Sequence, residues 1–400
     1  MNQPSTPLYR ITDSRPHFPG AERWTYLDLG GRGLLSNEVR AAIDAQLDDN
    51  MYNGGNKDLM FQRTRETRER FAELIHAAPG DIAYTKNISD GLNMVAAALD
   101  WSPGDNVIVC ADLEHPSNLY PWLNQQRRGL TVKMIKHRDG HMPVDDMIAA
   151  IDDKTRVLTT STVSFSPGFR TDIDRLGKAC RDRGVLFLVD AAQSAGVVDI
   201  DVVKSQVDAL SVSTQKGLLG LYGMGFLYLR KEWADRMQPA YLARFGVDLG
   251  DAHESEGGDG RYSLMPGAHR FDLGNYNYVA IAAAHASLGF LLRAGVRNIE
   301  THTAALGHSL ANGLLDLGLP VCGGRPDARI VHTVTVGDFG SGSDKYTSNE
   351  TINGLYQHLV DNKVKLSMRR GVMRFSFHVY NNAADVERVI DLSRDFLKIP

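Results

Sequence analysis

The sequence of 400 residues is poor in cysteine, and this scarcity excludes two kinds of structure. It contains Cys110, Cys180 and Cys322, an odd number without metal-ligand spacing. A disulfide framework needs paired cysteines, and a structural zinc site needs closely spaced ligand pairs. The sequence therefore predicts neither, and its cysteine usage favours a reducing cytoplasm.

Long apolar runs and a strong excess of one charge are also missing. The longest apolar stretch, 278–292, is interrupted by His285 and is too short to span a bilayer. Residues 1–7 are polar and proline-rich, without the basic and apolar regions of a signal peptide. The formal net charge of −4 gives no reason to expect nucleic acid or an anionic membrane as a partner. We expect a soluble, cytoplasmic protein.

The sequence does contain short apolar runs that lead into polar residues. The run 185–189 predicts a strand buried on both faces, and Asp190 follows it directly. A second strand is predicted at 207–213, shortly before Lys216. Open α/β sheets bind their ligands at the carboxyl ends of the strands. The two strands can therefore bring a carboxylate and an amine to one crevice.

This pair suits the chemistry of pyridoxal phosphate (PLP). A lysine forms a Schiff base with the cofactor aldehyde and later moves protons, while a carboxylate keeps the pyridine nitrogen protonated. Gln193 is placed to hydrogen-bond the ring oxygen. Taken singly, Lys216 is more simply a solvated loop residue, and Asp190 a helix cap. Their combination favours the cofactor.

Longer motifs around these residues resemble the class V aminotransferase family. Val-Asp-Ala-Ala-Gln at 189–193 and Ser-Thr-Gln-Lys-Gly at 213–217 are followed by Gly-Met-Gly-Phe-Leu-Tyr-Leu at 223–229, and the resemblance extends from about Tyr26 to the C-terminus. The family includes cysteine desulfurases, selenocysteine lyases, kynureninase-like enzymes and isopenicillin N epimerase-like proteins. The resemblance implies a PLP-dependent enzyme of fold type I.

The expected fold is α/β. Strand, helix and strand alternate with short connections between 80 and 215, which predicts a mostly parallel sheet with right-handed crossovers. The resemblance implies a large domain with a sheet of the seven-stranded type flanked by helices, and a smaller α+β C-terminal domain. We expect an N-terminal arm at 1–25 that packs with the small domain, the PLP-binding domain at 26–277 and the small domain at 278–400.

The resemblance also assigns residues to the cofactor phosphate. The segment 82–93 resembles the family's strand, turn and helix at this group, and a helix beginning near Asp90 would offer free N–H groups to an anion. The residues predicted to bind the phosphate are Asn87, Ile88, Ser89, Ser213 and Gln215. Taken alone, Ser89 is more simply a helix cap. Gln215 replaces the histidine usual in the family.

Asn275 is predicted to reach the cofactor phosphate of a neighbouring subunit. The segment 270–275 resembles the family's Arg-Phe-Glu-x-Gly-Thr element, with Asn275 in place of threonine. The resemblance therefore implies a homodimer with shared active sites.

Two further motifs supply residues around the substrate. His115 lies in a match to the family's Glu-His-x-x-Asn pattern, which implies stacking on the ring and proton transfer, although a His-Pro pair is otherwise often a turn. Arg374 lies in a match to Arg-x-Ser-x-His-x-Tyr-Asn, which implies a bidentate grip on the substrate α-carboxylate. An arginine in a strand otherwise more often pairs with a structural acid. Ser164 is predicted near the substrate, but Phe165 replaces the family's usual asparagine.

The absence of a cysteine before Arg374 narrows the reactions that the sequence predicts. Cysteine desulfurases carry a nucleophilic cysteine on the loop before the carboxylate-binding arginine, and 365–371 contains none, so persulfide-forming desulfuration is not expected. An aminotransferase acting at the Cα of an amino acid, through an external aldimine and a quinonoid, is expected first. The alternatives are a β-eliminating lyase, a racemase or epimerase, and a PLP-fold binding protein without turnover.

An arginine pair and an acidic segment each allow two interpretations. Arg369 and Arg370 hint at a second anionic group on the substrate, but an exposed basic pair is the simpler interpretation. The acidic, glycine-rich segment 250–260 indicates either a mobile lid or a solvated insertion.

Overall fold

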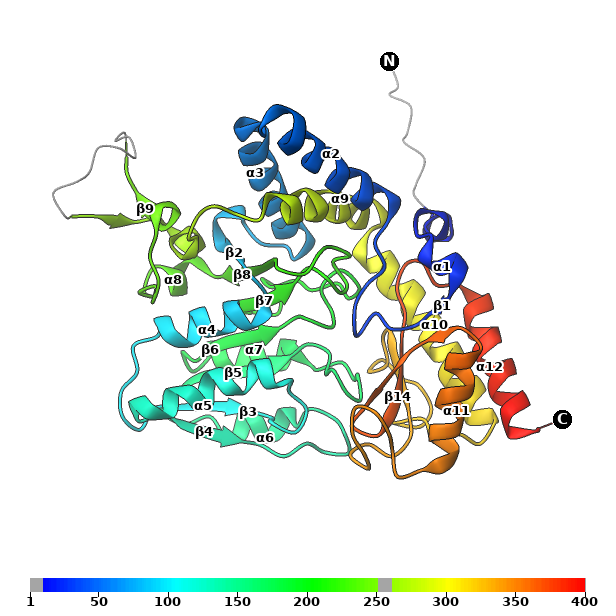
Figure 1. Cartoon of the computed structure of the whole chain (residues 1–400). Helices are drawn as coiled ribbons and strands as arrows, with labels where there is room; N and C mark the ends of the chain where they lie inside the picture. Colours follow the sequence, from blue (N-terminus) through cyan, green and yellow to red (C-terminus); the bar gives the residue numbers. More distant parts are fainter. Residues whose placement is uncertain (1–9, 251–260, 400) are drawn as a thin grey trace, which may run out of the picture.

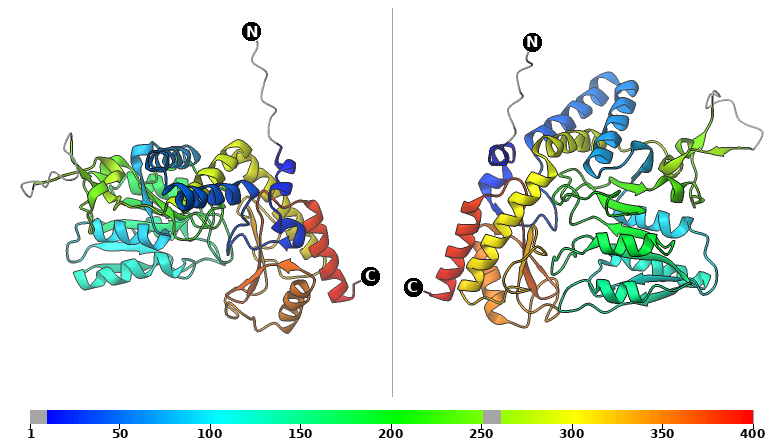
Figure 2. Two further views of the ribbon diagram at one scale, coloured as in Figure 1. Left: turned by 45° about the horizontal axis from the view of Figure 1, so that its top comes forward. Right: turned by 180° about the vertical axis from the view of Figure 1, so that it is seen from behind.

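The computed structural model describes residues 10–250 and 261–399 (Figure 1). A large sheet with helices on both faces occupies one side of the molecule, and a small sheet with its own helices occupies the other (Figure 2). All but Gly250 of the predicted acidic lid lies outside the described residues.

The large sheet has seven strands. In spatial order they are β2 (Ile82–Thr85), β8 (Gly225–Leu229), β7 (Ala209–Ser213), β6 (Leu186–Asp190), β5 (Thr155–Ser161), β3 (Asn106–Val109) and β4 (Thr131–Met134). Strand β8 runs antiparallel to both of its neighbours, and all other pairs are parallel. The prediction of a mostly parallel α/β sheet is therefore confirmed.

Helices cover both faces of this sheet because its central strands are apolar on both faces. In β6, Leu186 and Leu188 belong to one core and Phe187 and Val189 to the other. The first face is covered by α4 (Ile88–Ala98), α5 (Tyr120–Gln125) and α8 (Lys231–Ala234). The second is covered by α3 (Lys57–Leu74), α6 (Val144–Ala149), α7 (Ile173–Arg181) and α9 (Tyr278–Ala294). Helix α2 (Asn37–Asn53) packs on α9.

The small sheet is antiparallel, with β14 (Val372–Ser376) between β11 (Thr333–Val336) and β13 (Ser367–Arg369). Met373 and Phe375 alternate with Arg374 along β14 and pack in a separate apolar core. Residues of α10 (Val296–Asp316), α11 (Glu350–Asp361) and α12 (Ala383–Leu397) complete that core. The polar side chains of β14 therefore lie on the opposite face of the sheet.

The N-terminal segment joins the small sheet region. After α1 (Gly20–Arg23), β1 (Thr25–Tyr26) pairs in parallel with β12 (Val364–Lys365), and Asp28 forms a bridge with Ser376. The remaining strands, β9 (Val247–Asp248) and β10 (Ser263–Leu264), form a hairpin. Within the described ranges, no single helix has the length and apolarity of a membrane span; only α9 and α10 taken together, with a bend of 75° between them, meet that description.

Candidate active site

A cavity of about 330 Å³ opens at the carboxyl ends of β5, β6 and β7. Ser161 and Asp190 end β5 and β6, and Lys216 follows β7. Parallel strands present their last residues at one edge, which is why segments far apart in sequence meet here. The lining residues are Gly31, Asn87, Ile88, Ser89, Glu114, His115, Ser117, Ser161, Val163, Phe165, Asp190, Ala192, Gln193, Ser213, Gln215, Lys216 and Tyr222.

Lys216 is held in the turn after β7 by a close backbone approach. The Gly33 N–H donates to the Gln215 carbonyl at 2.8 Å, and a Cβ on Gly33 would lie 2.6 Å from the Lys216 carbonyl oxygen. Burial lowers the pKa of the Lys216 amine to about 8, although the Asp190 carboxylate opposes this shift. A substantial fraction of the amine is therefore neutral and nucleophilic near physiological pH.

The lowered pKa of Lys216 predicts a pH dependence for capture of PLP by the cofactor-free protein. Only the neutral amine attacks an aldehyde, so the capture rate should rise about tenfold per pH unit below pH 8 and level off above it. Stopped-flow absorbance at a series of pH values measures this rate. A rate that keeps rising to pH 10 would show an ordinary lysine pKa.

Two buried carboxyl groups face the same cavity. Asp190 is 4% exposed, and its Oδ1 accepts from the Ala192 N–H at 2.8 Å. Glu114 is 1% exposed and accepts from the Ser161 N–H at 2.7 Å and from the Asn118 amide at 2.9 Å. Burial raises the pKa of Asp190 to about 6 and that of Glu114 to about 7, the latter also because of the Asp190 charge. The pair makes this end of the cavity suited to a protonated ring nitrogen.

The His115 ring forms one wall with Phe165. Its Nδ1 accepts from the Ser117 N–H at 3.2 Å, so the neutral ring carries its proton on Nε2. The two rings meet edge to face, with centroids 5.4 Å apart. Burial and the Lys216 charge lower the pKa of His115. The imidazole is therefore neutral at pH 7. Phe165, which stands where the sequence analysis expected an asparagine, gives this wall an apolar surface.

The N-terminus of α4 also lines the cavity. This helix begins at Ile88, and its cap is Asn87, whose Oδ1 accepts from the Asp90 N–H at 3.0 Å. The helix start predicted near Asp90 is therefore two residues too late, and the alternative of Ser89 as the cap is wrong. Ser213 Oγ accepts from the Ile88 N–H at 2.9 Å, and Ser89 Oγ donates to Ser117 Oγ at 2.9 Å. Backbone donors, hydroxyl groups and the helix dipole suit a phosphate here.

Arg374 extends from β14 to the backbone of Phe165, a residue that lines the cavity. It is 2% exposed, its Nε donates to Ser367 Oγ at 3.2 Å, and its Nη1 donates to the Phe165 carbonyl at 2.8 Å. Its Nη2 lies 3.8 Å from Asp28 Oδ1, and neither of these buried atoms has a hydrogen-bond partner in the described structure. Burial lowers the pKa of the guanidinium to about 10. Asp28 is thus an ion-pair partner of Arg374, as the structural alternative for this arginine expected, but the Nη2 donor without a hydrogen bond is suited to an anionic ligand.

Gly30 makes room for this guanidinium. A Cβ at position 30 would lie 2.6 Å from Arg374 Cζ. Gly30→Ala should therefore displace the arginine and lower kcat/KM about 10- to 100-fold, mainly through KM. Steady-state kinetics tests this, with Gly80→Ala as a control because a Cβ at Gly80 meets nothing within 4 Å. Unchanged kinetics in Gly30→Ala would contradict the role given to the arginine.

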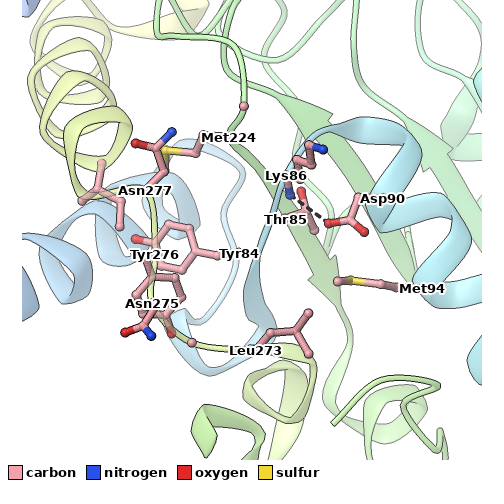
Figure 3. Close-up of a pocket in the computed structure, with 13 residues that line it drawn as sticks. Tyr84, Thr85, Lys86, Asp90, Met94, Met224, Leu273, Asn275, Tyr276 and Asn277 are labelled. Carbon is pink, nitrogen blue, oxygen red and sulfur yellow. Dashed lines mark hydrogen bonds between the residues drawn. The ribbon is translucent and has the colours of Figure 1, made fainter. Parts of the chain in front are cut away.

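Of three other predicted residues, Gln193 lines the cavity, whereas Ser164 and Asn275 do not. Gln193 lines the cavity, and its Nε2 donates to the Gly30 carbonyl at 3.2 Å. Ser164 is buried outside the lining, and its Oγ accepts from the Gly168 N–H at 3.1 Å. Asn275, with φ of 48°, lines a second cavity of about 230 Å³ together with Lys86 and Asn277 (Figure 3). Lys216 and Asp190 therefore line one cavity, and Asn275 of the same chain lines another.

Sequence reasoning gave no site role to Glu114, Ser117, Ser161 or Tyr222, which also line the cavity. Ser161 had a usable signal, because it ends a predicted strand beside the strand of Asp190. Glu114 had another, because it precedes His115 in the same motif. Tyr222 had none, since its approach depends on the long-range fold.

The polar groups of the cavity fit PLP. Asp190 is placed for a ring nitrogen, the α4 N-terminus for a phosphate and Lys216 for an aldehyde. In the described residues, no group of three or more His, Cys, Asp or Glu side chains is arranged to hold a metal ion.

Comparisons with known proteins identify the family of the chain. Residues 25–389 match the family described as aminotransferase class V. The uncharacterized aminotransferase YcbU of Bacillus subtilis is 31% identical over 377 residues, which is 94% of this chain and 95% of that protein. A probable cysteine desulfurase of Methanothermobacter thermautotrophicus is 32% identical over 299 residues, 73% of each chain.

Solved structures show the same fold. The apo cysteine desulfurase of Thermococcus onnurineus superposes with a TM-score of 0.83 at 25% identity, covering 100% of both chains. A C-DES mutant with glycine covalently linked to its PLP cofactor gives 0.82 at 22% identity, covering 95% of this chain and 98% of that one. The fold type I prediction is thereby confirmed.

Proposed function

This chain belongs to the class V aminotransferase family of PLP-dependent enzymes, and from that premise we propose that it is an aminotransferase acting at the Cα of an amino acid. The observation that carries the proposal is the convergence on one cavity of a lysine with a lowered pKa, a buried carboxylate and, beside it, the unsatisfied guanidinium of Arg374. In this proposal Lys216 and the buried carboxylate bind the cofactor, and Arg374 holds the substrate carboxylate.

We propose the following residues as the PLP site. Asp190 would accept from the ring N–H, and the Gln193 amide would donate to the ring oxygen in place of the Gly30 carbonyl. The phosphate is held by the α4 N-terminus and neighbouring hydroxyl and amide groups, namely Asn87, Ile88, Ser89, Ser213 and Gln215. When bound, PLP supplies an electron sink that stabilises negative charge at the substrate Cα.

The protein groups then position the substrate and move its protons. Arg374 binds the α-carboxylate through Nη2, which orients the Cα–H bond toward Lys216. The neutral Lys216 amine takes the proton from Cα, as its pKa of about 8 allows. His115 and Phe165 wall the cavity and limit the access of water. Transamination would require Lys216 to return this proton to the cofactor and not to Cα, and water would then release the 2-oxo acid and leave the amino group on the cofactor.

Persulfide formation is not part of this proposal. The β13–β14 hairpin before Arg374 closes with a turn of two residues, Arg370 and Gly371, which leaves no loop for a nucleophile. The three cysteines lie elsewhere: Cys110 and Cys180 are buried, and the Cys322 thiol donates to the Gly337 carbonyl. Burial raises the pKa of all three thiols, that of Cys110 to about 12. We therefore expect no thiolate at the substrate.

A β-eliminating lyase is the second candidate. The 32% identical relative named as a probable cysteine desulfurase favours it, because such an enzyme also breaks a bond at Cβ. The same Lys216 and Arg374 would serve, with a leaving group on the substrate. Racemisation or epimerisation remains a third outcome of the same proton transfer.

We also propose a homodimer with shared sites. Asn275 lines a cavity distinct from that of Lys216, so any phosphate contact it makes is to a partner's cofactor. The domain boundaries at 26 and 278 stay predictions.

Product stoichiometry tests the reaction type. Loaded protein mixed with an amino acid, without a 2-oxo acid acceptor, should form one equivalent of 2-oxo acid per site and no ammonia. Turnover should resume when a second 2-oxo acid is added. Continuous release of ammonia would instead identify a lyase.

A further inference from the structure

Three arginines lie on one short hairpin, and its register separates their side chains. Ser367 pairs with Arg374, and Arg369 pairs with Val372, across the antiparallel strands β13 and β14. Side chains two residues apart on a strand share a face. Arg369 therefore lies on the same face as Ser367, which accepts the hydrogen bond from Arg374 Nε. Met368 lies on the other face, in the apolar core.

Arg369 has no carboxylate partner among the described residues. Its Nη1 donates to the carbonyl of its neighbour Met368 at 2.7 Å, and its side chain is only partly exposed. Buried arginines elsewhere in the fold are paired: Arg68 with Asp272 and Arg270 with Asp235, both at 2.7 Å. Arg369 is on the same face of the hairpin as Arg374, and its positive charge lowers the pKa of Lys216, His115 and Arg374.

Arg370 has a different environment and a structural role. Its Nη1 donates to the Asp112 carbonyl, and its guanidinium lies over the ring of Phe165, 4.8 Å from the centroid. A second ring, that of Phe339, lies 6.0 Å away. These contacts fix Arg370 as part of the wall beside His115. Among the described residues Arg369, unlike Arg370, lies over no aromatic ring, and its guanidinium donates to the Met368 carbonyl.

We propose that Arg369 binds a second acidic group on the substrate, so that the preferred substrates are amino dicarboxylic acids of four or five carbons. The inference rests on the proposed function in one respect, that Arg374 binds the α-carboxylate. The two arginines are offset by two residues along the hairpin, about 7 Å. At that offset Arg374 Nη2 and the Arg369 guanidinium can each donate to one of the two carboxylates of such a molecule.

Inert anions test this without turnover. Calorimetric titration of the PLP-loaded protein should show succinate and glutarate binding at least tenfold more tightly than butyrate and pentanoate, which carry one carboxylate. Arg369→Gln should weaken the dicarboxylates about 10- to 100-fold and leave the monocarboxylates within about twofold. Unchanged monocarboxylate binding also shows that the variant folds. Arg127→Gln, on an exposed turn, is the matched control and should change neither.

The inference is overturned if wild-type protein binds both classes equally, or if Arg369→Gln weakens both to the same extent. Turnover separates this failure from that of the proposed function. Glutamate compared with glutamine, and aspartate with asparagine, differ in charge at nearly constant shape. If 2-oxo acid forms from all four at equal kcat/KM, the aminotransferase stands and the role of Arg369 fails. If none forms, yet dicarboxylate binding depends on Arg369, the aminotransferase fails and the anion site stands.

Discussion

Replacing Lys216 with alanine is expected to lower kcat by about 10⁴-fold or more, because the same side chain attaches the cofactor and moves the substrate proton. The variant should also lose the visible absorbance that accompanies covalent attachment of PLP. Its fold should persist, since the Lys216 side chain makes no hydrogen bond in the described structure and the neighbouring contacts run through backbone atoms. Turnover and absorbance spectra measured on the same preparation provide both readouts.

Lys154→Ala is the matched control for this experiment, because Lys154 is exposed and far from the cavity. It should keep both absorbance and activity. Turnover by Lys216→Ala within tenfold of wild type would remove the lysine from the mechanism and refute the account of the site.

Asp190→Asn should lower kcat about 10²- to 10³-fold, the range observed when one buried electrostatic partner of a reacting centre is removed. The substitution is nearly isosteric, and an asparagine oxygen can still accept from the Ala192 N–H. The substitution removes the negative charge of Asp190, which stabilises a protonated ring nitrogen in a site that excludes water. Steady-state kinetics measures the loss, and the nitrogen-15 chemical shift of ring-labelled PLP reports whether the proton has left.

Asp190→Glu separates charge from position in this test. It keeps the carboxylate but moves it by one methylene, so it should retain the ring proton while losing activity through geometry. A ring nitrogen that stays protonated in Asp190→Asn would show that the neighbouring Glu114 supplies the charge instead, and would contradict the assignment of Asp190.

Local patterns predicted the centre of the fold well. The apolar run before Asp190 and the one before Lys216 became β6 and β7, because runs bounded by polar residues have few alternatives to a buried strand. Their parallel pairing then forced both side chains to one sheet edge. Arg374 was predicted from the family motif that its segment resembles, and β14 places its side chain on the face opposite the apolar core.

Long-range geometry was not predictable in the same way. The helix start at Ile88 had a local signal that was missed, because Asn87 caps the helix by accepting from the Asp90 N–H. The further bond from the Ile88 N–H to Ser213, 125 residues along the chain, had no local signal. Ser164 is an exception, because it accepts from the Gly168 N–H only four residues along the chain, and this local turn was missed. The face on which Arg369 lies follows from the two-residue turn of its hairpin, which fixes the register and which motif matching overlooked.

Covalent trapping is the most direct test of the central claim that Lys216 carries the cofactor. Borohydride reduction of the PLP-loaded protein, followed by peptide mass mapping, locates the attached group on a specific residue. The account predicts one modified lysine, Lys216, in the peptide that follows β7, and no attachment in Lys216→Ala. Stable attachment at another lysine, or none in the wild-type protein, would contradict it.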